Sequence, residues 1–178
     1  MEMGPVDRIT ADAVGDPGFR TFYLQARWGS ELATVSVEKE QVQLLSASIL
    51  EILADVPLET GEGPPDDQLA LEEPIEPRWR AGRLSIGYEP ERDLFLLELV
   101  EYVPEPGEDD DPDDPRFEEL PDPESIRLWA TREQMLALSR HGAAVVERGR
   151  PTCQFCGNPM DPEGHICPAM NGHHPRTR

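Results

Sequence analysis

All three cysteines of this 178-residue chain fall in one window near its C-terminus, which constrains how that end can fold. Two residues separate Cys153 from Cys156, and His165 and Cys167 follow after a loop of eight residues. Three thiolates and one imidazole are the number and kind of ligands that a closed tetrahedral zinc site requires. The spacing therefore predicts a zinc site that folds a segment too short to hold itself together.

Other interpretations of this window remain open. A Cys-x-x-Cys pair can be a redox pair, but that chemistry favours a motif at the start of a helix after a strand. Here the pair follows a predicted helix and lies among prolines and glycines. A segment with no metal, or with a disulfide, is the remaining alternative. We expect His165 to be the fourth ligand, with His173 and His174 as alternatives, and four protein ligands make the zinc structural and not catalytic.

The chain is strongly acidic, with a formal net charge of -20. This charge argues against general binding to nucleic acid or to an anionic membrane surface, because both require clustered Lys and Arg. The C-terminal region is the least acidic, so weak nucleic-acid contact by the cysteine segment stays an alternative. No apolar run approaches the roughly twenty residues of a membrane span, and the first residues lack a secretory signal pattern. We therefore expect a cytoplasmic protein.

The first half of the chain predicts two strands and a helix. Residues 19–28 are rich in aromatics and predict a strand, Gly29 and Ser30 a turn, and residues 31–37 the returning strand. Apolar residues at three- and four-residue steps then predict a helix that ends at Pro57. Its inner face is expected to consist of Val42, Leu45, Ile49, Ile52 or Leu53, and Val56.

The second half predicts a similar series. Residues 83–88 and 93–103 predict two strands, and the second is so apolar that we expect it to be central and covered on both faces. Residues 126–130 predict a short strand. Thr131 and Gln134 then form a capping-box pattern that begins a second helix, which ends near residue 149.

Both predicted helices follow a strand directly and begin with Glu-Gln, at Glu40-Gln41 and at Glu133-Gln134. The echo suggests a two-fold arrangement, although shared helix-start chemistry explains it about as well. The fold class expected is α+β: an antiparallel sheet of about five strands with both helices on one face. This body is expected to occupy residues 1–150, with acidic, proline-rich loops at 57–78 and 104–124, and a zinc-binding ribbon and tail at 151–178.

Other candidate sites have weaker support. The Asp-rich run 108–114 has no turn glycine and is broken by proline, so we expect a solvated acidic loop or a patch for a basic partner, not a calcium site. Arg80 and Arg83 could grip an anion, although such arginines more often pair with neighbouring acids. His141, on the second predicted helix, is expected to face solvent or to lie in the C-terminal turn of that helix. No phosphate loop, Gly-x-Ser-x-Gly elbow or His-Glu-x-x-His motif occurs.

Three motifs resemble those of DUF3090, a bacterial family of unknown function. They are the opening Gly15-Asp16-Pro17-Gly18-Phe19-Arg20-Thr21-Phe22-Tyr23-Leu24-Gln25-Ala26-Arg27, the helix entry Val37-Glu38-Lys39-Glu40-Gln41-Val42, and the ending from Cys153 to Pro168 with Asn171-Gly172. The resemblance covers essentially the whole chain. It implies one domain that ends in a zinc-binding knuckle. The family has no established activity, so the resemblance supplies no catalytic residues to carry over to this chain.

These observations together favour a zinc-binding cytosolic protein that is not an enzyme and acts through contacts with a protein partner. One alternative is an enzyme that acts on a phosphorylated or other anionic small molecule through Arg80 and Arg83. The other alternative is weak nucleic-acid contact by the zinc ribbon.

Overall fold

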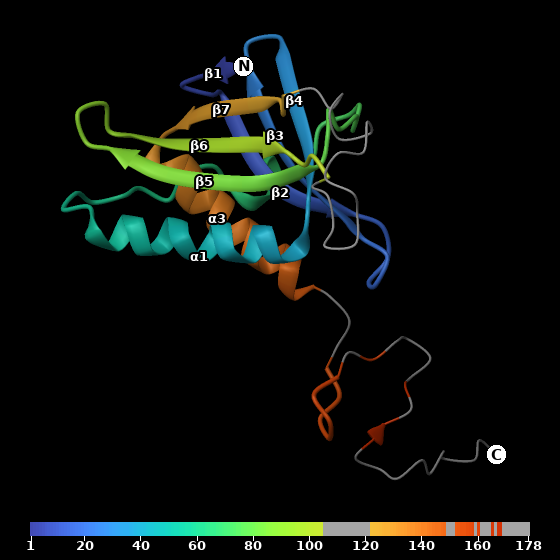
Figure 1. The fold of residues 1–178 in the computed structure, drawn as a ribbon. Coiled ribbons are helices and arrows are strands. Elements are labelled where there is room, and N and C mark those ends of the chain that lie inside the picture. The colour runs from blue at the N-terminus through green and yellow to red at the C-terminus, as the bar shows by residue number, and fades with distance from the viewer. Residues whose placement is uncertain (105–121, 149–151, 159, 161–164, 166, 169–178) are drawn as a thin grey trace.

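The described part of the body contains seven strands and two long helices (Figure 1). The computed structural model describes residues 1–104, 122–148, 152–158, 160, 165 and 167–168. In chain order the elements are β1 (Glu2–Met3), β2 (Arg8–Val14), β3 (Thr21–Trp28), β4 (Glu31–Val37), α1 (Lys39–Asp55), the 3-10 helix η1 (Asp66–Gln68), β5 (Ala81–Glu89), β6 (Leu94–Glu101), β7 (Ser125–Ala130) and α3 (Arg132–Glu147).

The strands form two sheets, one of four strands in the order β1-β7-β6-β5 and one of three in the order β2-β3-β4. All neighbours pair antiparallel except β1, which runs parallel to β7. The α+β class is confirmed, but the expected single antiparallel sheet of about five strands is wrong. Each half of the chain forms its own three-stranded meander, and β1 is added to the meander of the other half.

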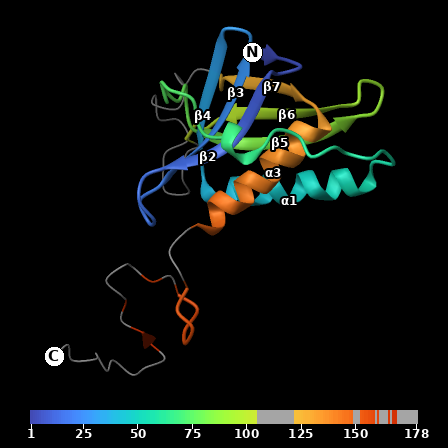
Figure 2. The ribbon, with the colours of Figure 1, turned by 180° about the vertical axis from the view of Figure 1, so that it is seen from behind.

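A hydrophobic core fills the space between the sheets and the helices, which lie side by side beneath the strands in Figure 1. Alternate residues of the strands face it, as the period of two requires, and they meet the apolar face of α1 that the sequence predicts. Helix α3 packs on β2, as Figure 2 shows, and α1 packs on β5. The core residues of α1 include Val42, Leu45 and Ile49, and those of α3 include Met135 and Leu138.

Strand β6 lies between β5 and β7, so its predicted central position is confirmed. Phe95, Leu97 and Leu99 on one face are buried, but Leu96, Glu98 and Val100 on the other face are only half-buried. The expectation that both faces are covered is therefore wrong. The outer face instead carries an ion pair between Glu98 and Arg127, with 2.9 Å between nitrogen and oxygen.

Residues 57–78 include an ordered stretch over the polar face of the three-stranded sheet. Thr10, Gln25 and Thr34 lie side by side in register on that face and are buried. The hydroxyl of Thr10 donates to the carbonyl of Leu69, and the amide of Gln25 donates to the carbonyl of Glu72 at 2.9 Å. Buried polar groups require such partners, so these bonds fix the stretch on the sheet. Of the second acidic loop, residues 105–121 lie outside the described residues.

The two halves of the chain pair with each other through the segments that lead into their meanders. β1 pairs in parallel with β7 before the chain enters β2, and Arg80 bridges in parallel to Ser36 of β4 before the chain continues along β5. The segment that leads into each meander therefore pairs with the last strand of the other one. The echo predicted at the two helix starts is part of a larger two-fold arrangement of three strands and a helix.

Candidate metal centre

The first half of the cysteine segment is a tight turn closed by backbone hydrogen bonds. The amide of Gly157 donates to the carbonyl of Cys153, and the amide of Cys153 donates to the carbonyl of Asn158, both at 2.8 Å. Gly157 has a φ of +73°, a left-handed conformation that glycine adopts at little cost. The turn brings the sulfur atoms of Cys153 and Cys156 close to the donor atoms of His165 and Cys167.

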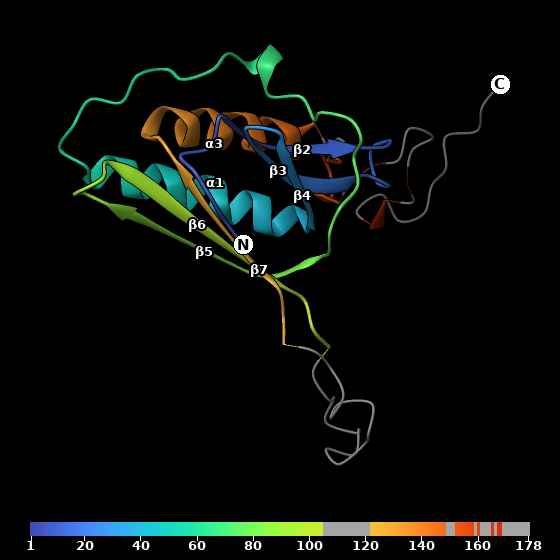
Figure 3. The same cartoon turned by 90° about the horizontal axis from the view of Figure 1, so that it is seen from above.

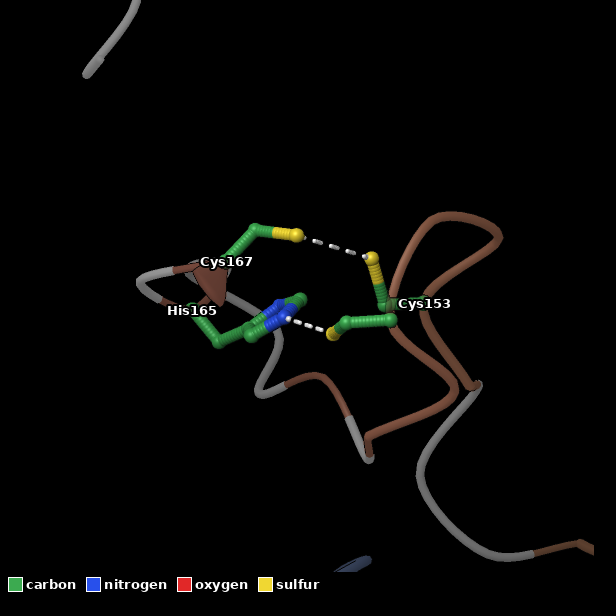
Figure 4. A group of neighbouring side chains, drawn as sticks. Cys153, His165 and Cys167 are labelled. Carbon is green, nitrogen blue, oxygen red and sulfur yellow. Dashed lines mark hydrogen bonds between the residues drawn. The ribbon is translucent and has the colours of Figure 1, made fainter. Parts of the chain in front are cut away.

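The four predicted ligands lie together, with their donor atoms all within 4.8 Å of one another. Cys153 Sγ is 3.8 Å from Cys167 Sγ, and Cys156 Sγ is 3.1 Å from His165 Nε2 (Figure 4). Tetrahedral zinc with Zn–S bonds of about 2.3 Å separates two sulfurs by about 3.8 Å, and a sulfur and a nitrogen by about 3.5 Å. The first pair therefore matches zinc geometry, and the second has to open by a few tenths of an ångström.

The electrostatics of the thiols also favour a cation between them. The backbone amides of Phe155 and Cys156 lower the pKa of the Cys153 thiol, and the Phe155 amide lies 3.5 Å from that sulfur. At Cys156 a backbone hydrogen bond at Asn158 also acts to lower the pKa, but burial and the thiols of Cys167 and Cys153 outweigh it and raise the pKa. A metal ion removes this conflict, because each thiolate then interacts with the positive charge.

The turn presents an aromatic side chain that the sequence analysis did not single out. Phe155 lies between the two cysteines of the knuckle, and 70% of it is exposed. By contrast, Cys153 is 6% exposed, so this predicted ligand is shielded while Phe155 faces solvent. The alternatives His173 and His174 lie outside the described residues.

The prediction that His141 faces solvent is wrong. It is 4% exposed on α3, between two carboxylates. Its Nδ1 contacts Asp66, and its Nε2 lies 3.3 Å from Asp12 Oδ2, within ion-pair distance although not in hydrogen-bond geometry. Asp12 and then, against an opposing effect of burial, Asp66 raise the pKa of His141. Asp66 is 75 residues away in sequence, which local patterns cannot reveal.

Arg80 and Arg83 line different hollows of the described surface. Arg80 lines a hollow of about 280 Å³ with Arg20 and Lys39, and its Nε lies 3.1 Å from a carboxylate oxygen of Glu38. Arg83 lies in separate hollows. The ion pair of Arg80 agrees with the expectation that such arginines pair with neighbouring acids.

The architecture and the Cys/His group define an α+β protein with a C-terminal cluster that could hold a metal ion. Neither long helix of the described chain has the length and apolarity to cross a membrane. The chain belongs to DUF3090, a family of proteins of unknown function, whose sequence model matches residues 1–167. This match confirms the resemblance seen in the sequence motifs. Comparison with curated proteins and with solved structures gave no match.

Proposed function

We propose that Cys153, Cys156, His165 and Cys167 hold one structural zinc ion, and that the protein is a cytoplasmic, non-enzymatic protein that acts by binding another protein. The observation that carries the proposal is the approach of four protein donor atoms to within 4.8 Å of one another. Soft thiolates with one imidazole suit zinc better than calcium or magnesium, which prefer oxygen. A closed set of four ligands fits a structural ion.

The knuckle also supports a role in protein contacts. The side chain of Phe155 is 70% exposed. A partner that covered it would remove this apolar surface from water, which favours binding. Phe155 sits between two ligands, so the metal would hold its backbone rigid. A rigid aromatic anchor binds with a small loss of conformational entropy, which is why such residues dominate many interfaces.

Metal analysis of the full chain tests the zinc site. We expect one zinc per chain in the native protein and in a Thr152→Ser control, which alters a neighbouring residue that is not a ligand. Cys153→Ser should lose the zinc, because serine is a poor ligand for this metal. A folded native protein without metal, or a Cys153→Ser variant that keeps stoichiometric zinc, would refute this part of the proposal.

A comparison of two neighbouring variants tests the contact through Phe155. Phe155→Ala and Gln154→Ala both shorten exposed side chains of the turn, and neither removes a ligand. We expect zinc content to stay the same in both. Proteins that co-purify with the native chain should be retained by Gln154→Ala and lost with Phe155→Ala. Equal retention by both variants would show that the knuckle is not the contact surface.

A further inference from the structure

Strand β5 forms one edge of the four-stranded sheet, as Figure 3 shows. Within the described residues it pairs with β6 on one side and with no strand along its other side. Proteins usually protect such edges with short strands, prolines or lysines. β5 has nine residues, and its sequence Ala-Gly-Arg-Leu-Ser-Ile-Gly-Tyr-Glu contains neither proline nor lysine. Its single irregularity lies at the start, between Ala81 and Arg83.

The hydrogen-bond pattern shows which residues of β5 present free backbone groups. The amide of Glu101 in β6 donates to Glu124, on the β7 side of that strand. Alternation along β6 then directs the backbone of Val100 and every second residue before it toward β5. These residues pair with Arg83, Ser85, Gly87 and Glu89. The amides and carbonyls of Leu84, Ile86 and Tyr88 therefore point away from β6, toward the open edge.

Apolar side chains accompany this edge. Leu84 and Ile86 pack only partly against the core. With Leu44 and Leu45 of α1 they line a hollow of about 310 Å³ beside the strand. Leu44 is 69% exposed. A partner that pairs with β5 would therefore meet both free backbone groups and apolar surface.

We propose that the partner at this edge is a second copy of the chain, whose β5 pairs antiparallel with this one about a two-fold axis at Ile86. In this register Ile86 faces the partner's Ile86, and Leu84 faces the partner's Tyr88. Both pairs use backbone groups that point outward, so each residue exchanges two hydrogen bonds with its opposite. The two four-stranded sheets join into one sheet of eight.

Charge complementarity selects this register and a second copy as the occupant. Arg83 lies opposite the partner's Glu89, and the two-fold axis creates this pair twice. The backbone groups of both residues point toward β6, so the pair forms no hydrogen bonds across the new interface. Opposite side chains come closest at such positions. Axes at Leu84, Ser85 or Gly87 also allow antiparallel pairing, but they separate Arg83 from the partner's Glu89. They also shorten the pairing of the regular part of β5, residues 83–89.

Charge reversal of full-length, zinc-loaded protein tests the dimer, with molar mass measured by light scattering over a range of concentrations. We expect the native mass to rise toward twice that of one chain. Arg83→Glu and Glu89→Arg should each raise the dimer dissociation constant about tenfold or more, because two like-charged pairs form in place of two opposite pairs. The double variant Arg83→Glu/Glu89→Arg should dimerise like the native chain. Arg140→Glu, an equal charge change at an exposed site on α3, should have no effect on dimerisation.

Hydrogen exchange gives a second readout that does not depend on a variant. The amides of Leu84, Ile86 and Tyr88 should gain protection as the concentration rises. Those of Ser85 and Gly87, already bonded to β6, should stay unchanged. A protein that remains monomeric, a dimer that Arg83→Glu leaves intact, or a double variant that fails to regain the native dissociation constant would each overturn the proposal.

Discussion

Gln41 and Gln134 make equivalent hydrogen bonds in the two halves of the protein. Each side-chain oxygen accepts from the backbone amide three residues earlier, at Glu38 (2.8 Å) and Thr131 (2.9 Å) respectively. Each side-chain nitrogen then donates to a carbonyl at the entry of the other half, from Gln41 to Ala81 and from Gln134 to Val6. The residue that helps begin each helix therefore also fastens it to the opposite meander.

Replacing Gln134 by alanine should destabilise the fold by about 1–2 kcal/mol, because it removes a cap bond and the bond to Val6. Gln41→Ala should cost less, since the side-chain nitrogen of Gln41 donates over 3.3 Å, shared between the carbonyls of Ala81 and Gly82. The bond from Gln134 to Val6 is 2.8 Å long. Urea unfolding of the two variants measures this. Gln43→Ala, at an exposed site on α1, is the control and should stay within about 0.5 kcal/mol of the native chain. Equal values for all three would contradict the fastening role.

The crossing of α1 and α3 depends on a glycine. A Cβ on Gly142 would lie 3.0 Å from Ser46 Oγ and 3.1 Å from Val42 Cγ1, so there is no room for a large side chain. Gly142→Leu should lower the free energy of unfolding by about 1–3 kcal/mol through overpacking. Ala47→Leu makes a similar addition on the exposed face of α1 and should be nearly neutral. Thermal unfolding compares the two, and an equally stable Gly142→Leu would show that the helices separate easily.

His141 should make stability depend on pH. Its folded-state pKa is raised above the ordinary value of 6.5, so its contribution is complete below that pH and is lost as pH rises through the folded pKa. Burial acts to raise the pKa of Asp12, but the nearby His141 outweighs it and the pKa is lowered. The hydrogen bond to His141 lowers the pKa of Asp66. Their contribution is present above about pH 4 and is lost as pH falls through the folded values.

The ion pairs of His141 therefore stabilise the fold most between about pH 4 and the ordinary histidine pKa of 6.5. His141→Gln should cost about 1 kcal/mol more near pH 5.5 than near pH 8.5, a modest difference because Asp66 is exposed and water screens it. Unfolding by urea at the two pH values measures it. Arg140→Gln, at the exposed neighbouring position, is the control. A cost for His141→Gln that is the same at both pH values would refute the ion-pair assignment.

The fourth ligand of the knuckle can be identified by single substitutions. His165→Ala should weaken zinc binding about a hundredfold or more, since the site then has three protein ligands. His173→Ala and His174→Ala should leave the affinity unchanged, and they serve as matched controls. Competition with a chromogenic chelator measures all three affinities. A large loss in either control with none in His165→Ala would transfer the ligand role to the tail.

Local chemistry made most elements of the body predictable. The alternating residues 31–37 form β4, and Thr131 with Gln134 forms the cap that the sequence indicates. The four residues brought together at the knuckle are also those that the spacing suggests, because a short segment leaves few other arrangements. Whether they bind zinc, and whether residues 151–178 act as a separate unit, stay predictions.

Long-range pairing explains what could not be predicted. β2 combines the polar residues Arg8, Thr10 and Asp12 with apolar ones, and Thr10 is buried where residues 68–72, distant in sequence, cover the sheet. β1 is two residues long and has no pattern of its own, so its parallel place beside β7 is set by tertiary structure. His141 is buried for the same reason, through partners on two distant segments.

The segment that leads into each meander pairs with the last strand of the other meander. The chain therefore has the arrangement of an intertwined dimer whose two subunits are joined into one polypeptide. A cut within residues 57–64 would yield two fragments, each lacking the strand partner and the helix that the other supplies. Neither fragment encloses a complete core, whereas the two mixed together contain every contact of the uncut body. We therefore expect the two fragments to complement each other, and the two halves to fold together.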